Sequence, residues 1–155
     1  MLQRKQTVFL LLAFIAIVVC LALPIGRFLA TGEGADYIMY NNTLYATAET
    51  DIYIPAMLCS PLAILLLIAC PLTLWTIFKY KNLRLQSMLC TSLILLMLLW
   101  IAWYVFVAFH RGIADTTFHP ALAAALPVIA IILYAMARKG IISDEKLLKA
   151  ADRIR

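Results

Sequence analysis

The side chains suited to acid–base or metal chemistry are few, and most of them lie near one short segment. His110 and His119 flank this segment, and Asp115 lies between them. Imidazole and carboxylate groups bind zinc and act as general bases. Their spacing matches no established metal motif, and the sequence offers no obvious third ligand. We interpret both histidines as water-facing residues and keep a metal-dependent enzyme as the least favoured hypothesis.

The four cysteines, Cys20, Cys59, Cys70 and Cys90, all lie within long apolar segments. None belongs to a Cys-x-x-Cys pair, which is the spacing of thiol–disulfide exchange proteins. We interpret them as small buried side chains and leave open a disulfide between Cys20 and Cys59. The sequence also lacks a phosphate-binding Gly-rich loop and an HExxH zinc motif. It therefore predicts no catalytic residue, no metal site and no cofactor.

A cluster of aromatic residues offers a different chemistry, the binding of a flat or apolar ligand. Trp100, Trp103 and Tyr104 follow the i, i+3, i+4 spacing that places side chains on one face of a helix. Residues of this kind commonly form an interfacial belt or pack against other helices. The alternative is a pocket for a lipid tail or a quinone, lined by these three residues.

The composition identifies the kind of element that must position these residues. The chain has 155 residues, of which 65% are hydrophobic and 14% charged, and its mean hydropathy is +0.96. Soluble domains are about 45–50% apolar and about 25% charged. The sequence therefore argues against a soluble enzyme, a secreted disulfide scaffold and a disordered tail. It predicts a single integral membrane domain over residues 1–155.

Four charge-free segments predict membrane spans at 7–25, 54–78, 87–109 and 120–137. Each is close to the roughly 20 residues that cross a hydrocarbon core. Each must be helical, because lipid offers no hydrogen-bond partners to the backbone of an open strand. The spans contain no Asp, Glu, Lys or Arg, which argues against an ion-coupled transporter.

The basic residues indicate the orientation of the chain. Eleven of the 13 Lys and Arg residues lie on the side of the two termini, and only Arg27 and Arg111 lie on the other. The positive-inside rule then places both termini in the cytoplasm. A basic cytoplasmic face is attracted to anionic lipid, so no nucleic-acid partner is expected. Cleavage of the first span as a signal peptide is a minor alternative, because its apolar run exceeds the usual length of about 7–15 residues.

The long outer loop, 27–53, predicts a small β-hairpin. Two β-prone runs flank a pair of asparagines at 41–42, and asparagine tolerates the positive φ of a two-residue turn. The register would set Ile38 opposite Tyr45, so that Tyr40 and Tyr45 share one face. That face would cap the helices or meet a partner or lipid headgroups.

The cytoplasmic tail, 138–155, predicts a short amphipathic helix. Ser143 could cap its N-terminus, and Leu147 and Leu148 would begin its apolar side. A basic helix of this kind lies on an anionic leaflet or docks on a partner. The candidate partner or headgroup contacts in the whole chain are Arg4, Tyr40, Tyr45, Lys146, Lys149, Asp152, Arg153 and Arg155.

The two ends of the chain carry a family resemblance. The start, Met-Leu-Gln-Arg-Lys-Gln over 1–6, and the end, Asp-Glu-Lys-Leu-Leu-Lys-Ala-Ala-Asp-Arg-Ile-Arg over 144–155, resemble the bacterial four-span family called domain of unknown function 4293. Leu2, Lys5, Leu148 and Ala150 are mild departures from its pattern. The resemblance implies an inner-membrane protein of a Gram-negative bacterium with no assigned activity and no catalytic residues. The architecture is also similar to the claudin-type bundle, without the paired loop cysteines.

The expected fold is an all-α membrane protein, a four-helix bundle with a small outer hairpin and a short amphipathic C-terminal helix. We expect a non-enzymatic accessory or scaffold protein, or a self-associating bundle, in the inner membrane. Its expected partners are an anionic inner leaflet and another membrane protein or a second copy of itself. A lipid- or quinone-binding protein is the alternative, and a metal-dependent membrane enzyme is the third hypothesis.

Overall fold

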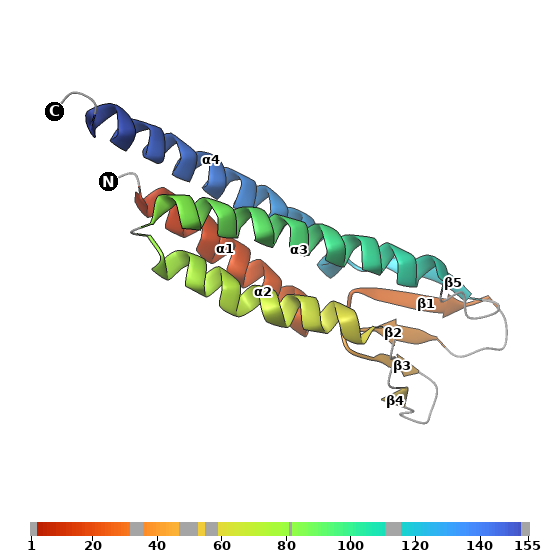
Figure 1. Cartoon of the computed structure of the whole chain (residues 1–155). Coiled ribbons are helices and arrows are strands. Elements are labelled where there is room, and N and C mark those ends of the chain that lie inside the picture. Colours follow the sequence, from red (N-terminus) through yellow and green to blue (C-terminus); the bar gives the residue numbers. More distant parts are fainter. Residues whose placement is uncertain are drawn as a thin grey trace.

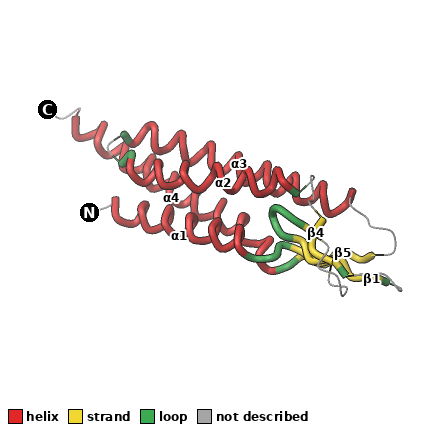
Figure 2. Tube along the Cα trace, turned by 90° about the horizontal axis from the view of Figure 1, so that it is seen from below, coloured by secondary structure: helices red, strands yellow, loops and turns green. Residues whose placement is uncertain are grey.

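The computed structural model describes residues 3–31, 36–46, 53–54, 59–80, 82–110 and 116–152. Its helices are α1 (Gln3–Ala22), α2 (Ser60–Phe78), α3 (Leu83–His110) and α4 (Leu126–Asp152), the last preceded by a 3₁₀ turn at Leu122–Ala125. The strands are β1 (Gly26–Ala30), β2 (Tyr37–Met39), β3 (Leu44–Ala46), β4 (Tyr53–Ile54) and β5 (Thr116–Pro120). The helices run side by side, with both termini at one end and the strands at the other (Figures 1 and 2). We call these the termini end and the sheet end.

All four helices are long and apolar enough to cross a membrane, which confirms the predicted number of spans. Only 28–33% of the residues in each spanning segment are buried. Many of the remaining positions carry large exposed apolar side chains, such as Leu67, Leu95 and Ile132. A bundle that is apolar on its outside as well as its inside is suited to lipid and not to water.

The helices differ from the predicted spans at the sheet end. The first was expected to reach residue 25, but α1 ends at Ala22 and the chain then turns into β1. The second was expected from residue 54, but α2 begins at Ser60, with Pro61 in its first turn. Proline is tolerated there because a first-turn N–H has no helical partner. The fourth was expected from residue 120, but Thr116–Pro120 forms a strand.

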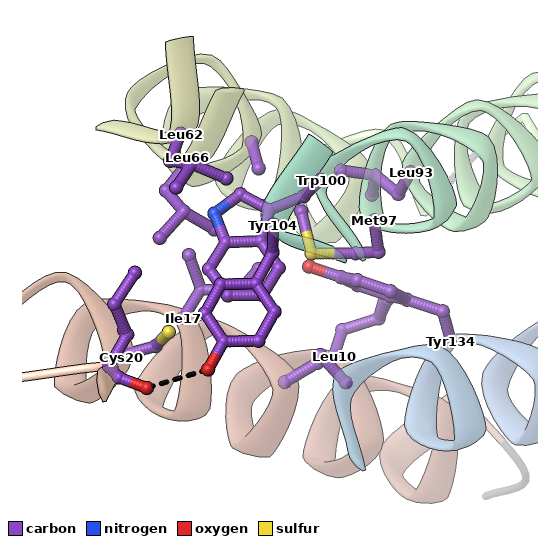
Figure 3. Packing of buried hydrophobic residues seen from close by; sticks show 14 of the residues in the cluster. Leu10, Ile17, Cys20, Leu62, Leu66, Leu93, Met97, Trp100, Tyr104 and Tyr134 are labelled. Atoms are coloured by element: carbon purple, nitrogen blue, oxygen red, sulfur yellow. Dashed lines mark hydrogen bonds between the residues drawn. The ribbon is translucent and has the colours of Figure 1, made fainter. Parts of the chain in front are cut away.

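The four helices form a ring in which each packs chiefly against its two sequence neighbours, and α4 closes the ring on α1. Leucine, isoleucine and methionine side chains fill the centre (Figure 3). Tyr134 reaches across the ring from α4 to α2, where its hydroxyl lies 2.6 Å from Thr73 Oγ1. The Thr73 hydroxyl also donates to the Ala69 carbonyl at 2.7 Å. These buried hydroxyls are therefore satisfied inside the helix bundle, as lipid requires.

The strands form one antiparallel sheet in the order β4-β3-β2-β1-β5. The predicted hairpin register is confirmed, because Ile38 pairs with Tyr45 and the Tyr40 N–H donates to the Thr43 carbonyl at 2.8 Å. The sheet is larger than the predicted hairpin, because it also includes β1, β4 and β5. The strand after α1 pairs along its whole length with the strand before α4, so two separate loops build a single sheet.

The prediction of a separate amphipathic tail helix was wrong, because α4 continues without a break to Asp152. Ser143 lies inside the helix instead of capping a new one, and Gly140 also lies within it. A Cβ at Gly140 would lie 3.1 Å from Gln6 Cγ, so the glycine gives room to the Gln6 side chain of α1. Gln6 Nε2 then donates to Asp144 Oδ2 at 2.5 Å. This contact with α1 stabilises the helical conformation of the segment, although Gly140 and Ser143 by themselves favour a helix end or a cap.

Candidate functional site

The turn of the β2–β3 hairpin inserts one side chain between the helices. Asn41 is 1% exposed, and its Nδ2 donates to the Cys20 carbonyl at 2.6 Å. The last carbonyls of a helix have no partner within the helix, so Asn41 caps the end of α1. Trp100 Nε1 in α3 donates to Asn41 Oδ1 at 3.3 Å. One asparagine therefore joins the sheet to two helices.

Aromatic rings complete the connection between bundle and sheet. The Tyr104 ring stacks on Trp100, with centroids 5.3 Å apart and planes 9° apart. Its hydroxyl donates to the Ile25 carbonyl at 2.8 Å, the bond drawn as a dashed line in Figure 3. Phe118 of β5 lies edge-on to Tyr104. It also packs against Phe28 of β1, with the two ring centroids 4.8 Å apart. We call Asn41, Trp100, Tyr104, Phe28 and Phe118 the junction.

A glycine makes close packing at the junction possible. A Cβ at Gly26 would lie 2.7 Å from the ring of Phe118. Any other residue would therefore push Phe118 away from Phe28 and Tyr104. The sequence gives no local sign of this requirement, because Gly26 and Phe118 meet only through the pairing of β1 with β5.

The structure brings two of the three predicted pocket residues together and separates the third. Trp100 is 0% and Tyr104 is 9% exposed, and their rings fill the space that a ligand would need. Trp103 lies beside Phe106, with ring centroids 5.4 Å apart. The lining of the two cavities described next includes none of these three residues. The geometry thus supports a structural role for Trp100 and Tyr104.

A groove of about 920 Å³ lies between the hairpin and the adjoining ends of α1 and α2. We call it the sheet-end groove. Its polar side is lined by Tyr40 and Tyr45. Their rings pack edge to face, with centroids 5.4 Å apart. Its apolar side is lined by Leu21 of α1 and by Ile64 and Leu67 of α2. Both predicted tyrosine contacts therefore line one groove with polar and apolar sides.

Sequence reasoning missed the contribution of α2 to this groove. Ser60, Ala63, Ile64 and Leu67 line it, and their spacing places them on one helix face. That spacing was visible in the sequence. The missing information was that the hairpin folds over this face instead of another.

A second cavity, of about 400 Å³, lies beside α3 and α4 toward the termini end. Lys146, a predicted contact, lines it together with Arg138 and Lys139. Lys149 lies elsewhere and pairs with Glu145 at 2.6 Å. The remaining predicted contacts lie outside the described side chains: Arg4, Asp152, Arg153 and Arg155.

The residues of the enzyme hypothesis are only partly described. His119 lies on β5 opposite Arg27, is exposed, and has its Nε2 3.4 Å from Thr117 Oγ1. The His110 side chain and Asp115 lie outside the described residues. The described residues contain no group of three His, Cys, Asp or Glu side chains that could hold a metal ion. No disulfide joins Cys20 and Cys59 in the structure.

Comparison with known protein families gives a match over nearly the whole chain. The model of one protein family, described as Domain of unknown function (DUF4293), matches residues 2–154. No curated protein matches the chain.

Proposed function

Because the chain belongs to this family of unknown function, its role must be inferred from its own structure, and we propose that it is a non-enzymatic accessory or scaffold subunit of a membrane assembly. In this proposal the helix bundle is a base and the β-sheet is the surface offered to a partner protein. The chain would lie in the bacterial inner membrane, with the termini end in the cytoplasm and the sheet end outside.

The observation that carries the proposal is the insertion of Asn41 between α1 and α3. Two hydrogen bonds to this one side chain, and a third from Tyr104 to Ile25, fix the sheet on the bundle. The polar atoms of the junction are therefore used for attachment. A sheet held in one orientation is suited to recognition, because a partner need not order it on binding.

The distribution of charge supports the orientation. Of the eight Lys and Arg side chains that the structure describes, only Arg27 lies at the sheet end. The other seven belong to the termini end or to helix segments leading to it: Lys5, Lys79, Arg84, Arg138, Lys139, Lys146 and Lys149. The positive-inside rule applies to such an arrangement. The sheet end would then face the extracytoplasmic side, where a fixed β-surface can meet a partner.

Site-specific photo-cross-linking in the native host tests this proposal. A photoreactive residue replaces Tyr45, which is 41% exposed on β3, and the matched control replaces Leu95, which is 62% exposed on α3. We expect an adduct of defined mass at position 45, absent at position 95 and weakened by Asn41→Ala. A chain that gives no adduct at position 45, and purifies alone from native membranes in mild detergent, would overturn the proposal.

The sheet-end groove favours a second candidate function, the binding of a lipid-like molecule. Polar groups on the hairpin face apolar side chains on α2 across one cavity, an arrangement that suits a ligand with a polar head and an apolar tail. The ligand would lie against Leu67 instead of the predicted Trp100. Leu67→Trp should remove a copurifying small molecule seen by native mass spectrometry, whereas Leu98→Trp, on an exposed face of α3, should not. Equal retention by both variants would exclude this candidate.

A further inference from the structure

We propose that the cavity beside α3 and α4 binds one anionic phospholipid of the leaflet at the termini end. We call this cavity the basic cleft. Its lining residues are Ile94 of α3 and Ala135, Arg138, Lys139, Ile142, Ser143 and Lys146 of α4. The phosphate would lie among the cations, and one acyl chain would lie against Ile94 and Ala135.

The spacing of the α4 residues makes the cleft a continuous strip. They fall at i, i+3, i+4, i+7, i+8 and i+11 from Ala135, which is one face of a helix. The opposite face of this segment is buried against the bundle through Ala137, Ile141 and Asp144. The basic strip therefore faces outward while the rest of the segment is anchored.

The three cations of the cleft have no acidic partner among the described residues. The carboxylates on the same part of α4 are already engaged, because Asp144 accepts from Gln6 and Glu145 pairs with Lys149. The lining contains three basic side chains, one hydroxyl and no carboxylate. A phosphate monoanion or dianion is complementary to this set, whereas a zwitterionic headgroup also brings its own cation toward Arg138 and Lys139.

The order of the lining residues along α4 matches the two parts of a phospholipid, the charged headgroup and the apolar acyl chain. Arg138 and Lys139 directly follow the charge-free run of α4, so they lie where hydrocarbon meets headgroup. Lys146 lies eight positions farther along, or about 12 Å at the rise of an α-helix. Ile94 and Ala135 continue the cleft in the apolar direction. An acidic peptide would leave its backbone groups unpaired against that apolar part, so a lipid fits better.

Competition between lipids tests the proposal. The full chain is placed in nanodiscs of equimolar phosphatidylglycerol and phosphatidylcholine, and the lipid retained after release is identified by native mass spectrometry. Arg138→Gln, Lys139→Gln and Lys146→Gln are combined in one variant. The matched control combines Lys5→Gln, Lys79→Gln and Lys149→Gln, which removes the same charge outside the cleft. Circular dichroism and gel filtration select variants that keep the fold.

We expect the wild type to retain phosphatidylglycerol preferentially, with one molecule per chain. The cleft variant should lose this preference by about tenfold or more, because it removes the three charged groups that would bind the phosphate directly. The control variant should keep most of it. Equal losses in both variants would show diffuse surface attraction and overturn the proposal, as would no loss in either.

A second pair of variants keeps the charge and changes the shape. Ala135→Phe fills the cleft, and Ile132→Phe places the same ring on an exposed position of the same helix outside the cleft lining. Only the first should lower phosphatidylglycerol retention. If both variants retain it equally, the lipid does not occupy the cleft. Cross-linking at Tyr45 tests the accessory role independently, so either proposal can fail alone.

Discussion

The two ends of the bundle are held together in different ways. At the sheet end, Asn41, Trp100 and Tyr104 link helices to strands through a network in which each polar group has a partner. At the termini end, one hydrogen bond joins the buried side chains of Gln6 and Asp144. Gln86 donates from Nε2 to the Thr76 carbonyl at 3.2 Å, but its buried Oε1 has no hydrogen-bond partner. The comparison suggests that the sheet end carries more of the stability, while the termini end leaves cations available to lipid.

Asn41→Ala should cause the largest loss of stability. It leaves the Cys20 carbonyl and the Trp100 N–H without partners in a buried place, and each such group costs about 1–3 kcal/mol. We expect the free energy of unfolding, measured by denaturant titration in mixed micelles, to fall by about 2–4 kcal/mol. Asn42→Ala is the control, since Asn42 is the exposed neighbour in the same turn. Equal losses would mean that the turn, and not the inserted side chain, supports this end.

Gln6→Leu should cause the next largest loss, at the opposite end. It leaves Asp144, which is 8% exposed, without its partner, at a cost of about 1–3 kcal/mol. Replacing both residues, in Gln6→Leu with Asp144→Leu, should recover most of that stability, because no buried polar group is then left unpaired. The same titration measures both variants. Additive losses in the double variant would contradict this account and indicate that packing at Gly140 dominates.

Tyr134→Phe, which lies midway between the two ends of the bundle, should lower the free energy of unfolding by less than either change above. It removes the hydroxyl bonded to Thr73, but Thr73 keeps its bond to the Ala69 carbonyl. The expected loss is about 1 kcal/mol, the net value of a hydrogen bond. Thr91→Ala, whose hydroxyl bonds only within its own helix, should lose less. A loss larger than that of Gln6→Leu would place the main polar anchor at the centre of the bundle.

The Glu145–Lys149 pair should contribute least. It is an i, i+4 pair with 71% of the lysine side chain exposed, and exposed pairs of this kind contribute little to stability because water screens them. A double-mutant cycle with alanine at both positions measures the coupling, which added salt should weaken. A coupling as large as the loss caused by Tyr134→Phe would show that the termini end is more rigid than the comparison implies.

Local patterns were enough for part of this structure. The number of spans followed from charge-free runs, because the absence of charge is a property of each segment by itself. The register of β2 and β3 followed from the two asparagines at their turn, because a two-residue loop fixes which residues lie opposite each other. The tyrosines at 40 and 45 were correctly placed near each other for the same reason.

Features that depend on distant residues could not be found in this way. No strand was predicted at β5, of which only Pro120 fell in the predicted fourth span, because its strand character appears only when β1 lies beside it. α4 was divided into a span ending at 137 and a separate tail helix because the side chain that packs there, Gln6, is far away in the sequence. For Trp100 the sequence left packing and a ligand pocket both open, because its partner Asn41 lies in a loop whose docking no local pattern reveals.

The pairing of β1 with β5 also constrains the order in which the chain can be assembled. β1 follows the first span, whereas β5 immediately precedes the fourth, about 90 residues later. At synthesis rates of about 5–20 residues per second, β1 would wait roughly 5–20 s for its partner. During that time one edge of β1 is an open template for other strands. A chaperone or early partner that covers this edge would therefore act before β5 is synthesised. A chain truncated before Thr116 should leave the sheet incomplete although β1, β2 and β3 are all present.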